Sequence, residues 1–234
     1  MRLSRFTACR IAFTLAAVGC ASARPSTPVF VMGAAGAIAR ARADSLRYPY
    51  TQADVDFMRG MIHHHAQAIR ISRWAPTHGA SASVQRLTAR IINAQSDEIT
   101  LMQTWLADRN QIPPNVDSTG QLTENHDMPA MNGHVMVAMP GMRDMAVMPG
   151  MLNDAQMKEL DAARGTAYDR LFLTYMMQHH RGAVAMVKTL FSSQGAGQDE
   201  SVFKFASDVE VDQSTEIRRM LSMMLEMGFA PPPS

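Results

Sequence analysis

Cysteine is almost missing from this chain, and the only two, Cys9 and Cys20, lie within its first 20 residues. If an N-terminal leader is removed, at most one cysteine remains, which excludes an internal disulfide framework. Aromatic residues are also scarce at 6%, whereas 21 residues are methionine. The core is therefore expected to be aliphatic and soft, and a hydrophobic content of 47% is enough for one packed domain.

An excess of charge of one sign is missing as well. The 22 basic residues nearly balance the 21 acidic ones, and the basic residues form no continuous stripe. A protein that grips phosphates usually carries such a stripe. We therefore expect no nucleic-acid partner.

The N-terminus lacks an apolar run long enough to span a bilayer, since the run IAFTLAAVG covers only residues 11–19. It follows Arg2, Arg5 and Arg10, a pattern typical of a secretory signal, so residues 1–23 are predicted to be a signal peptide. AVGC at 17–20 resembles a lipobox, which would make Cys20 the lipid-anchored first residue. ASA at 21–23 would instead give a soluble periplasmic protein. Export to the periplasm is predicted in either case, and the lipid anchor is the favoured version.

Two pairs of segments repeat along the chain. FMRGMIHHHAQAI at 57–69 matches FLTYMMQHHRGAV at 172–184, and QSDEITLM at 95–102 matches QSTEIRRM at 213–220. The order of these blocks indicates duplication of one helical hairpin. The sequence thus predicts an all-α four-helix bundle, with either up-and-down or crossover topology left open.

Helix boundaries follow from caps and breakers. Thr51 with Asp54 predicts a capping box before a first helix that ends near Ala75, and Asn153 with Gln156 predicts another before the third helix. The second helix is expected over 82–110 and the fourth over 199–227. The predicted organisation is a tether at 24–50, a bundle at 51–228 and a tail at 229–234. Within the bundle, hairpins at 51–110 and 153–228 flank a connection at 111–152.

The connection is rich in methionine. From Met136 to Met151 a methionine occurs at every third position, interrupted by proline, which suits an extended coil or loop rather than a helix. Thioethers are soft ligands that select Cu(I), although methionine also fills gaps over apolar surfaces. If these sulfurs collect Cu(I), they are expected to be interchangeable and to tolerate single losses. The candidates are Met139, Met142, Met145, Met148 and Met151.

Histidine pairs recur in both halves, each preceded by a methionine on the same helix face. Met61 shares a face with His64 and His65, and Met176 stands in the same relation to His179 and His180, with Met186 two turns further on. A lone histidine of this kind is usually a core residue with a hydrogen-bond partner. Duplication of the whole set favours a metal site, and imidazole with thioether suits copper, as Cu(I) and also as Cu(II).

The matching faces of the second and fourth helices repeat a glutamine, a glutamate and a methionine. A carboxylate there could hold an imidazole N–H, or it could have only a structural role. The residues are Gln95, Glu98 and Met102 in one half and Gln213, Glu216 and Met220 in the other.

These paired motifs, over roughly 50–227, resemble the family catalogued as domain of unknown function 305, described as ferritin-like four-helix bundles exported in bacteria, some of which bind copper. The resemblance implies copper ligation by the seven histidines and methionines at Met61, His64, His65, Met176, His179, His180 and Met186. This chain departs from the family at His63, where proline is common, and at Ile71, where methionine is frequent. The first site could therefore be poorer in thioether or recruit His63.

The resulting interpretation is a copper-binding protein for copper sequestration, homeostasis or resistance, rather than an enzyme. One alternative is a ferritin-like metal-dependent oxidase, for example one that oxidises Cu(I). A di-iron version is disfavoured because the chain has no Glu-x-x-His motif. Another alternative is a partner-binding lipoprotein with a methionine-rich surface and no metal.

Overall fold

The computed structural model describes residues 50–123 and 148–232, together with a few positions between 33 and 39. Its long helices are α2 (Gln52–Ser72), α3 (Ala82–Ala107), α5 (Gly165–Ser192) and α6 (Glu200–Glu226), and a shorter helix is α4 (Asp154–Ala162). The all-α prediction is confirmed. The predicted signal peptide, nearly all of the tether, and Met139, Met142 and Met145 lie outside the described residues.

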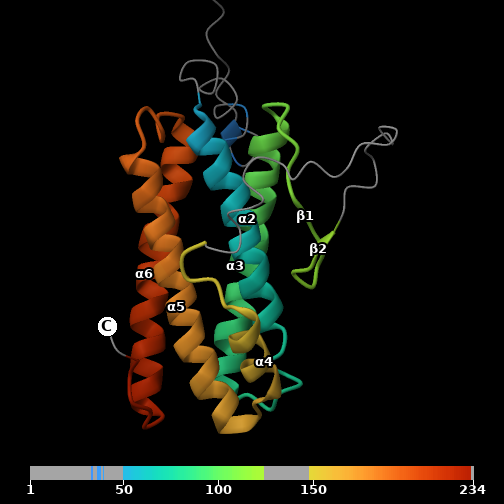
Figure 1. Cartoon of the computed structure of the whole chain (residues 1–234), viewed down its shortest axis with the longest axis vertical. Coiled ribbons are helices and arrows are strands. Elements are labelled where there is room, and N and C mark those ends of the chain that lie inside the picture. The colour runs from blue at the N-terminus through green and yellow to red at the C-terminus, as the bar shows by residue number, and fades with distance from the viewer. Residues whose placement is uncertain (1–32, 34–35, 38, 40–49, 124–147, 233–234) are drawn as a thin grey trace, which may run out of the picture.

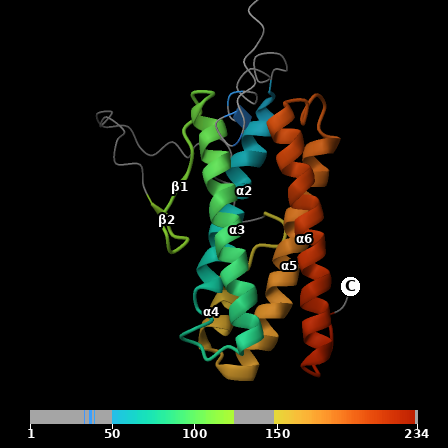
Figure 2. The ribbon, with the colours of Figure 1, turned by 180° about the vertical axis from the view of Figure 1, so that it is seen from behind.

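The long helices form two antiparallel hairpins, α2 with α3 and α5 with α6, and the hairpins meet along α2 and α5 (Figure 1). Helices α3 and α5 run in the same direction, as the colours in Figures 1 and 2 show. The connection between them must therefore return along the length of the bundle. Of the two topologies left open by the sequence, the structure has the one with a long crossover.

Both predicted capping boxes are present. The Asp54 carboxylate accepts a hydrogen bond from the Thr51 backbone N–H at 2.7 Å, and the side chain of Gln156 accepts one from the Asn153 N–H at 3.1 Å. The other carboxylate oxygen of Asp54 accepts from the N–H of Gly197 at 2.7 Å. The first cap therefore also ties α2 to the turn between α5 and α6.

The prediction of a single third helix after Asn153 is wrong, because the chain forms α4 and then α5. The break lies at Gly165, which has φ +55° and donates its N–H to the carbonyl of His78 at 2.8 Å. This positive φ is open to glycine at little cost. A contact with a residue far away in the sequence thus fixes the break.

The predicted connection at 111–152 begins with a short antiparallel ribbon, which the sequence did not indicate. Strands β1 (Asn115–Val116) and β2 (Leu122–Thr123) pair with Val116 opposite Leu122. Gly120 in the turn lies directly against α2, since a Cβ there would approach the Ala66 carbonyl oxygen to 2.4 Å. The ribbon therefore fixes the start of the connection on the first hairpin.

The core consists of two apolar clusters, one toward each end of the bundle. Met61 and Met102 belong to the cluster that contains the start of α2, and Met176 and Met220 belong to the other. The segments between these clusters carry buried polar side chains. In the described parts of the chain, no helix has the length and apolar character needed to cross a membrane.

Candidate metal centre

A layer of buried polar side chains crosses the bundle between the apolar clusters. Each long helix contributes to it, with histidines from α2 and α5 and glutamines from α3 and α6. Its histidines are completely buried, and its glutamines are at most 4% exposed; they are His64, His65, His179, His180, Gln95 and Gln213. Burying polar groups without partners is costly, so this layer is either fully bonded or built for a ligand.

At the centre of this layer, α2 and α5 bring His64 and His179 into contact. Their ring centroids are 3.7 Å apart and their planes are tilted by 40°. His65 lies 6.5 Å from His64, and His180 lies 6.4 Å from His179, again between ring centroids. The two equivalent histidine pairs of the repeat therefore form one cluster with approximate two-fold symmetry.

The outer histidine of each pair meets a glutamate from its own hairpin. The Nε2 atom of His180 donates a hydrogen bond to the Glu216 carboxylate at 2.6 Å, and Nε2 of His65 lies 2.6 Å from the Glu98 carboxylate. The His65 contact has the distance of an ion pair, but its angle falls outside hydrogen-bond geometry. A carboxylate at Nε2 leaves Nδ1 as the nitrogen with a free lone pair.

His64 is held by a backbone carbonyl rather than by a glutamate. Its Nε2 lies 3.1 Å from the backbone carbonyl of Pro149, and because a carbonyl can only accept, Nε2 carries the hydrogen. Nδ1 of His64 has no hydrogen-bond partner among the residues described. Neither ring nitrogen of His179 makes a hydrogen bond of normal geometry within the described residues, although the backbone carbonyl of His64 lies near the ring. Each neutral ring therefore keeps one buried nitrogen lone pair that accepts no hydrogen bond of normal geometry.

Burial keeps the inner pair uncharged. Loss of hydration, with the nearby His65, lowers the pKa of His64 to about 3. Burial and the neighbouring His64 hold the pKa of His179 well below its usual 6.5. Both rings are neutral at pH 7, so a metal would not have to displace a proton from either of them.

The methionines predicted as ligands lie around this layer. Met61 and Met176 are fully buried in the two apolar clusters, as are Met102 and Met220. Met186 is partly buried against the first cluster. Its Cε lies 3.3 Å from the place where a Cβ on Gly60 would be, and Met148 Sδ lies 3.5 Å from the same point.

His63, the possible substitute ligand, precedes His64 on α2 and is partly buried, and this burial lowers its pKa. Its Nδ1 is buried and lacks a partner in the described ranges. Sequence analysis missed the contributions of Gly60, Gln67 and Pro149. A glycine in the middle of an amphipathic helix was the available indication for Gly60, whereas nothing local marked the other two.

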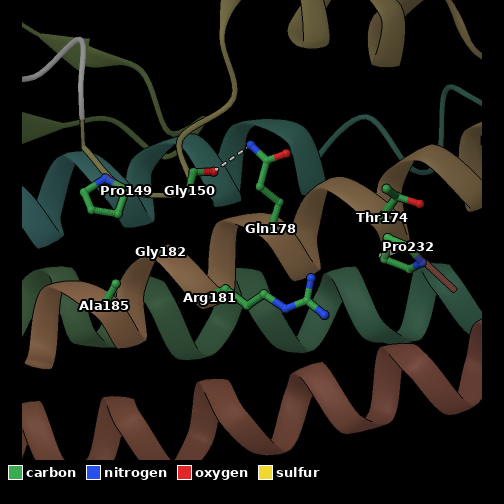
Figure 3. Close-up of a pocket in the computed structure, with 8 residues that line it drawn as sticks. All are labelled: Pro149, Gly150, Thr174, Gln178, Arg181, Gly182, Ala185 and Pro232. Carbon is green, nitrogen blue, oxygen red and sulfur yellow. Dashed lines mark hydrogen bonds between the residues drawn. The ribbon is translucent and has the colours of Figure 1, made fainter. Parts of the chain in front are cut away.

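The predicted ligands that the structure describes do not form a complete metal site built from imidazole and carboxylate groups. Within residues 50–123 and 148–232, no three His, Cys, Asp or Glu side chains converge as they would around an ion. A surface pocket of about 520 Å³ beside the bundle is lined by residues of α5 such as Gln178 and Arg181, and also by Pro149, Gly150 and Pro232, with no histidine (Figure 3). This pocket is therefore not the histidine centre.

The sequence matches the DUF305 family, a domain of unknown function, over residues 54–224. A DUF305 protein from Streptomyces coelicolor, described as secreted, is 28% identical with a TM-score of 0.59, over 78% of this chain and 98% of that one. A DUF305 fragment from Deinococcus radiodurans is 25% identical with a TM-score of 0.57, over 76% and 99%. CopM in its Cu(I)-bound form shares the fold, with 23% identity and a TM-score of 0.51 over 74% and 96%. No curated protein sequence matches.

Proposed function

The chain belongs to the DUF305 family, and we propose that it is an exported copper-binding protein that sequesters copper outside the cytoplasm. One observation carries this proposal: the buried contact between His64 and His179, each of which keeps one nitrogen lone pair that accepts no hydrogen bond of normal geometry in the described structure. A purely structural pair of buried histidines would be expected to satisfy its nitrogens. Lone pairs left free on neutral rings are what a metal ion needs.

The side chains around the pair favour copper over zinc. Met61 and Met176 flank the histidines along their helices, and the chain beyond its first 20 residues has no cysteine. Structural zinc sites rely on cysteine and histidine, whereas thioethers favour Cu(I) and imidazole accepts either copper oxidation state. CopM, solved in its Cu(I)- and Cu(II)-bound forms, has this fold, which supports the proposal at the level of the fold.

Export is supported by the signal-like N-terminus and by the secreted description of the Streptomyces coelicolor relative. Attachment through a lipid on Cys20 is part of the same proposal. The geometry favours binding over catalysis, because the inner histidines are fully enclosed and leave little room for a substrate other than the ion itself.

A competition titration tests the proposal. The purified protein is titrated with a chromogenic Cu(I) chelator under reducing conditions, and the same is done for His179→Leu. Residues that only support metal ligands change affinity by about 10–100-fold, so loss of a ligand should weaken Cu(I) binding by at least about tenfold. The helix content of this variant should stay unchanged.

His78→Gln is the matched control, since His78 is also a buried histidine. Both of its ring nitrogens are occupied, by Thr77 and Asp161, at the far end of the bundle. This variant should lose stability but keep its copper. Tighter binding of zinc than of copper, or wild-type copper affinity in His179→Leu, would contradict the proposal.

A further inference from the structure

The last residues of the connection, Met148–Leu152, are fastened across both hairpins, and we call them the docked segment. Gln67 of α2 holds its end: the side-chain amide donates to the Leu152 carbonyl at 3.0 Å and accepts from the Leu152 N–H at 2.8 Å. From α5, Gln178 donates to the Gly150 carbonyl at 3.4 Å (Figure 3). None of these bonds involves a metal ligand, so the segment is positioned before any ion binds.

Two glycines allow this segment to lie almost on the helix backbone. A Cβ on Gly182 would be 1.9 Å from the Pro149 carbonyl oxygen, so no other residue fits there without moving the segment. Gly150 has φ +78°, and a Cβ on it would meet the backbone of Gln178 at 2.6 Å. Figure 3 shows the segment crossing α5 at Gly182.

Docking places one methionine of the connection, Met148, against Gly60 of α2. Met148 Sδ and Met186 Cε both lie against Gly60, which has no side chain to separate them. Gly60 is one helical turn before His64 on the same face of α2. The next residue of the segment, Pro149, accepts the hydrogen bond from His64. Two thioethers and an imidazole are thus gathered from α2, α5 and the connection.

The duplicated helices differ at the positions that receive the docked segment. Counting from the matched phenylalanines, Gly60 corresponds to Tyr175, Gln67 to Gly182 and Ile71 to Met186. The histidines and their preceding methionines are identical in the two copies. The copies therefore agree on the histidine layer and diverge where one segment has to be held on one side of it.

We propose that Met148 is a metal ligand, which the docked segment supplies to the His64 centre together with Met186, and that this thioether pair selects a soft monovalent cation. The inference rests on the proposed copper function and adds a ligand from outside the helices. Thioethers prefer Cu(I) to harder divalent ions. Met148 is consequently not interchangeable with the other methionines of the connection, in contrast to the expectation from sequence.

The test compares Met148→Leu with Met157→Leu, in which the same change is made at a partly buried methionine of α4. Leucine keeps volume and apolarity, so the folding of both variants should resemble that of wild type. Affinity for Cu(I) and for Ag(I), a redox-inert probe, is measured by chelator competition. Because even supporting residues change metal affinity by about 10–100-fold, Met148→Leu should bind both ions at least about tenfold more weakly, and Met157→Leu should bind like wild type.

A double variant and a spectroscopic readout show whether the sulfurs share one ion. Met148→Leu with Met186→Leu should lose less affinity than the product of the two single losses, since either change already breaks the pair. With ¹³C-labelled methionine methyl groups, Ag(I) should shift the Met148 and Met186 signals together at the first equivalent.

The possible failures are distinguishable. Wild-type protein that binds neither Cu(I) nor Ag(I) would overturn both the copper function and this inference. Wild-type binding with an unaffected Met148→Leu variant, or with an unshifted Met148 methyl signal, would overturn only the assignment of Met148.

Discussion

In the first half of the bundle, His64 donates from Nε2 to the Pro149 carbonyl, whereas neither ring nitrogen of its counterpart His179 in the second half makes a hydrogen bond of normal geometry among the described residues. The outer histidines do not show this difference, since each meets a glutamate at 2.6 Å. Duplication thus accounts for the symmetric part of the centre. The asymmetric part comes from the connection, because a single segment can dock on only one side of the pair.

The largest expected effect is a dependence of the free energy of unfolding of the metal-free protein on pH, caused by the two inner histidines. The pKa of His64 falls from 6.5 to about 3 on folding, and that of His179 is also lowered. Between pH 6.5 and 3 the unfolded chain binds protons that the folded state excludes, so stability decreases as pH falls. The loss should be about 1.4 kcal/mol per pH unit from His64 alone within this window, and His179 adds a loss of the same sign.

Denaturant unfolding at a series of pH values measures this dependence. His64→Leu/His179→Leu serves as the comparison, because leucine cannot take up a proton. The double variant should lose much of the slope between pH 6.5 and 4. An unchanged slope would mean that other groups dominate the acid sensitivity of the fold.

A second prediction compares alanine at two glycines in the middle of α2 and α5. Glycine to alanine normally stabilises a helix by up to about 1 kcal/mol. In Gly60→Ala the new Cβ meets only the flexible ends of Met186 and Met148, so this variant should be as stable as wild type or slightly more stable. In Gly182→Ala the Cβ would collide with the Pro149 backbone and expel the docked segment.

Gly182→Ala should therefore be destabilised by roughly 1–3 kcal/mol, since the hydrogen bonds to Leu152, Gly150 and His64 are each worth about 0.5–1.5 kcal/mol and the helix gain offsets part of the loss. Thermal unfolding of both variants measures this. Amide exchange at Leu152 should become faster in Gly182→Ala alone. Equal stability of the two variants would show that the segment adds little to the fold.

The smallest expected effect comes from making the two halves more alike. Ile71 occupies the position that corresponds to Met186 and is completely buried in the second apolar cluster. Ile71→Met changes shape but hardly volume, so stability should change by less than about 1.5 kcal/mol. If the side of the centre next to Ile71 lacks only a thioether, Cu(I) stoichiometry or affinity should rise in the competition titration. An unchanged copper titration would indicate that a docked segment is needed as well.

Local sequence was sufficient for the helices and their caps, because these depend on residues within one or two turns. The capping boxes at Thr51 and Asn153 formed as predicted, and the repeat correctly indicated two hairpins. The break before Gly165 was not predictable in this way, since it depends on a hydrogen bond to His78 from another hairpin. The site roles of the predicted ligands stay predictions.

The sequence by itself determined that each half places a methionine and two histidines on one helix face, since helical periodicity fixes which residues share a face. It also determined the number of long helices and the composition of their buried sides. Only the tertiary structure decided that the rings of His64 and His179 are in contact. It also decided that the Pro149 carbonyl places the ring hydrogen of His64 on Nε2. Finally, it brought Met148 and Met186 together against Gly60. These contacts join residues that are far apart along the chain, where spacing carries no information and the packing of α2, α5 and the docked segment fixes every distance.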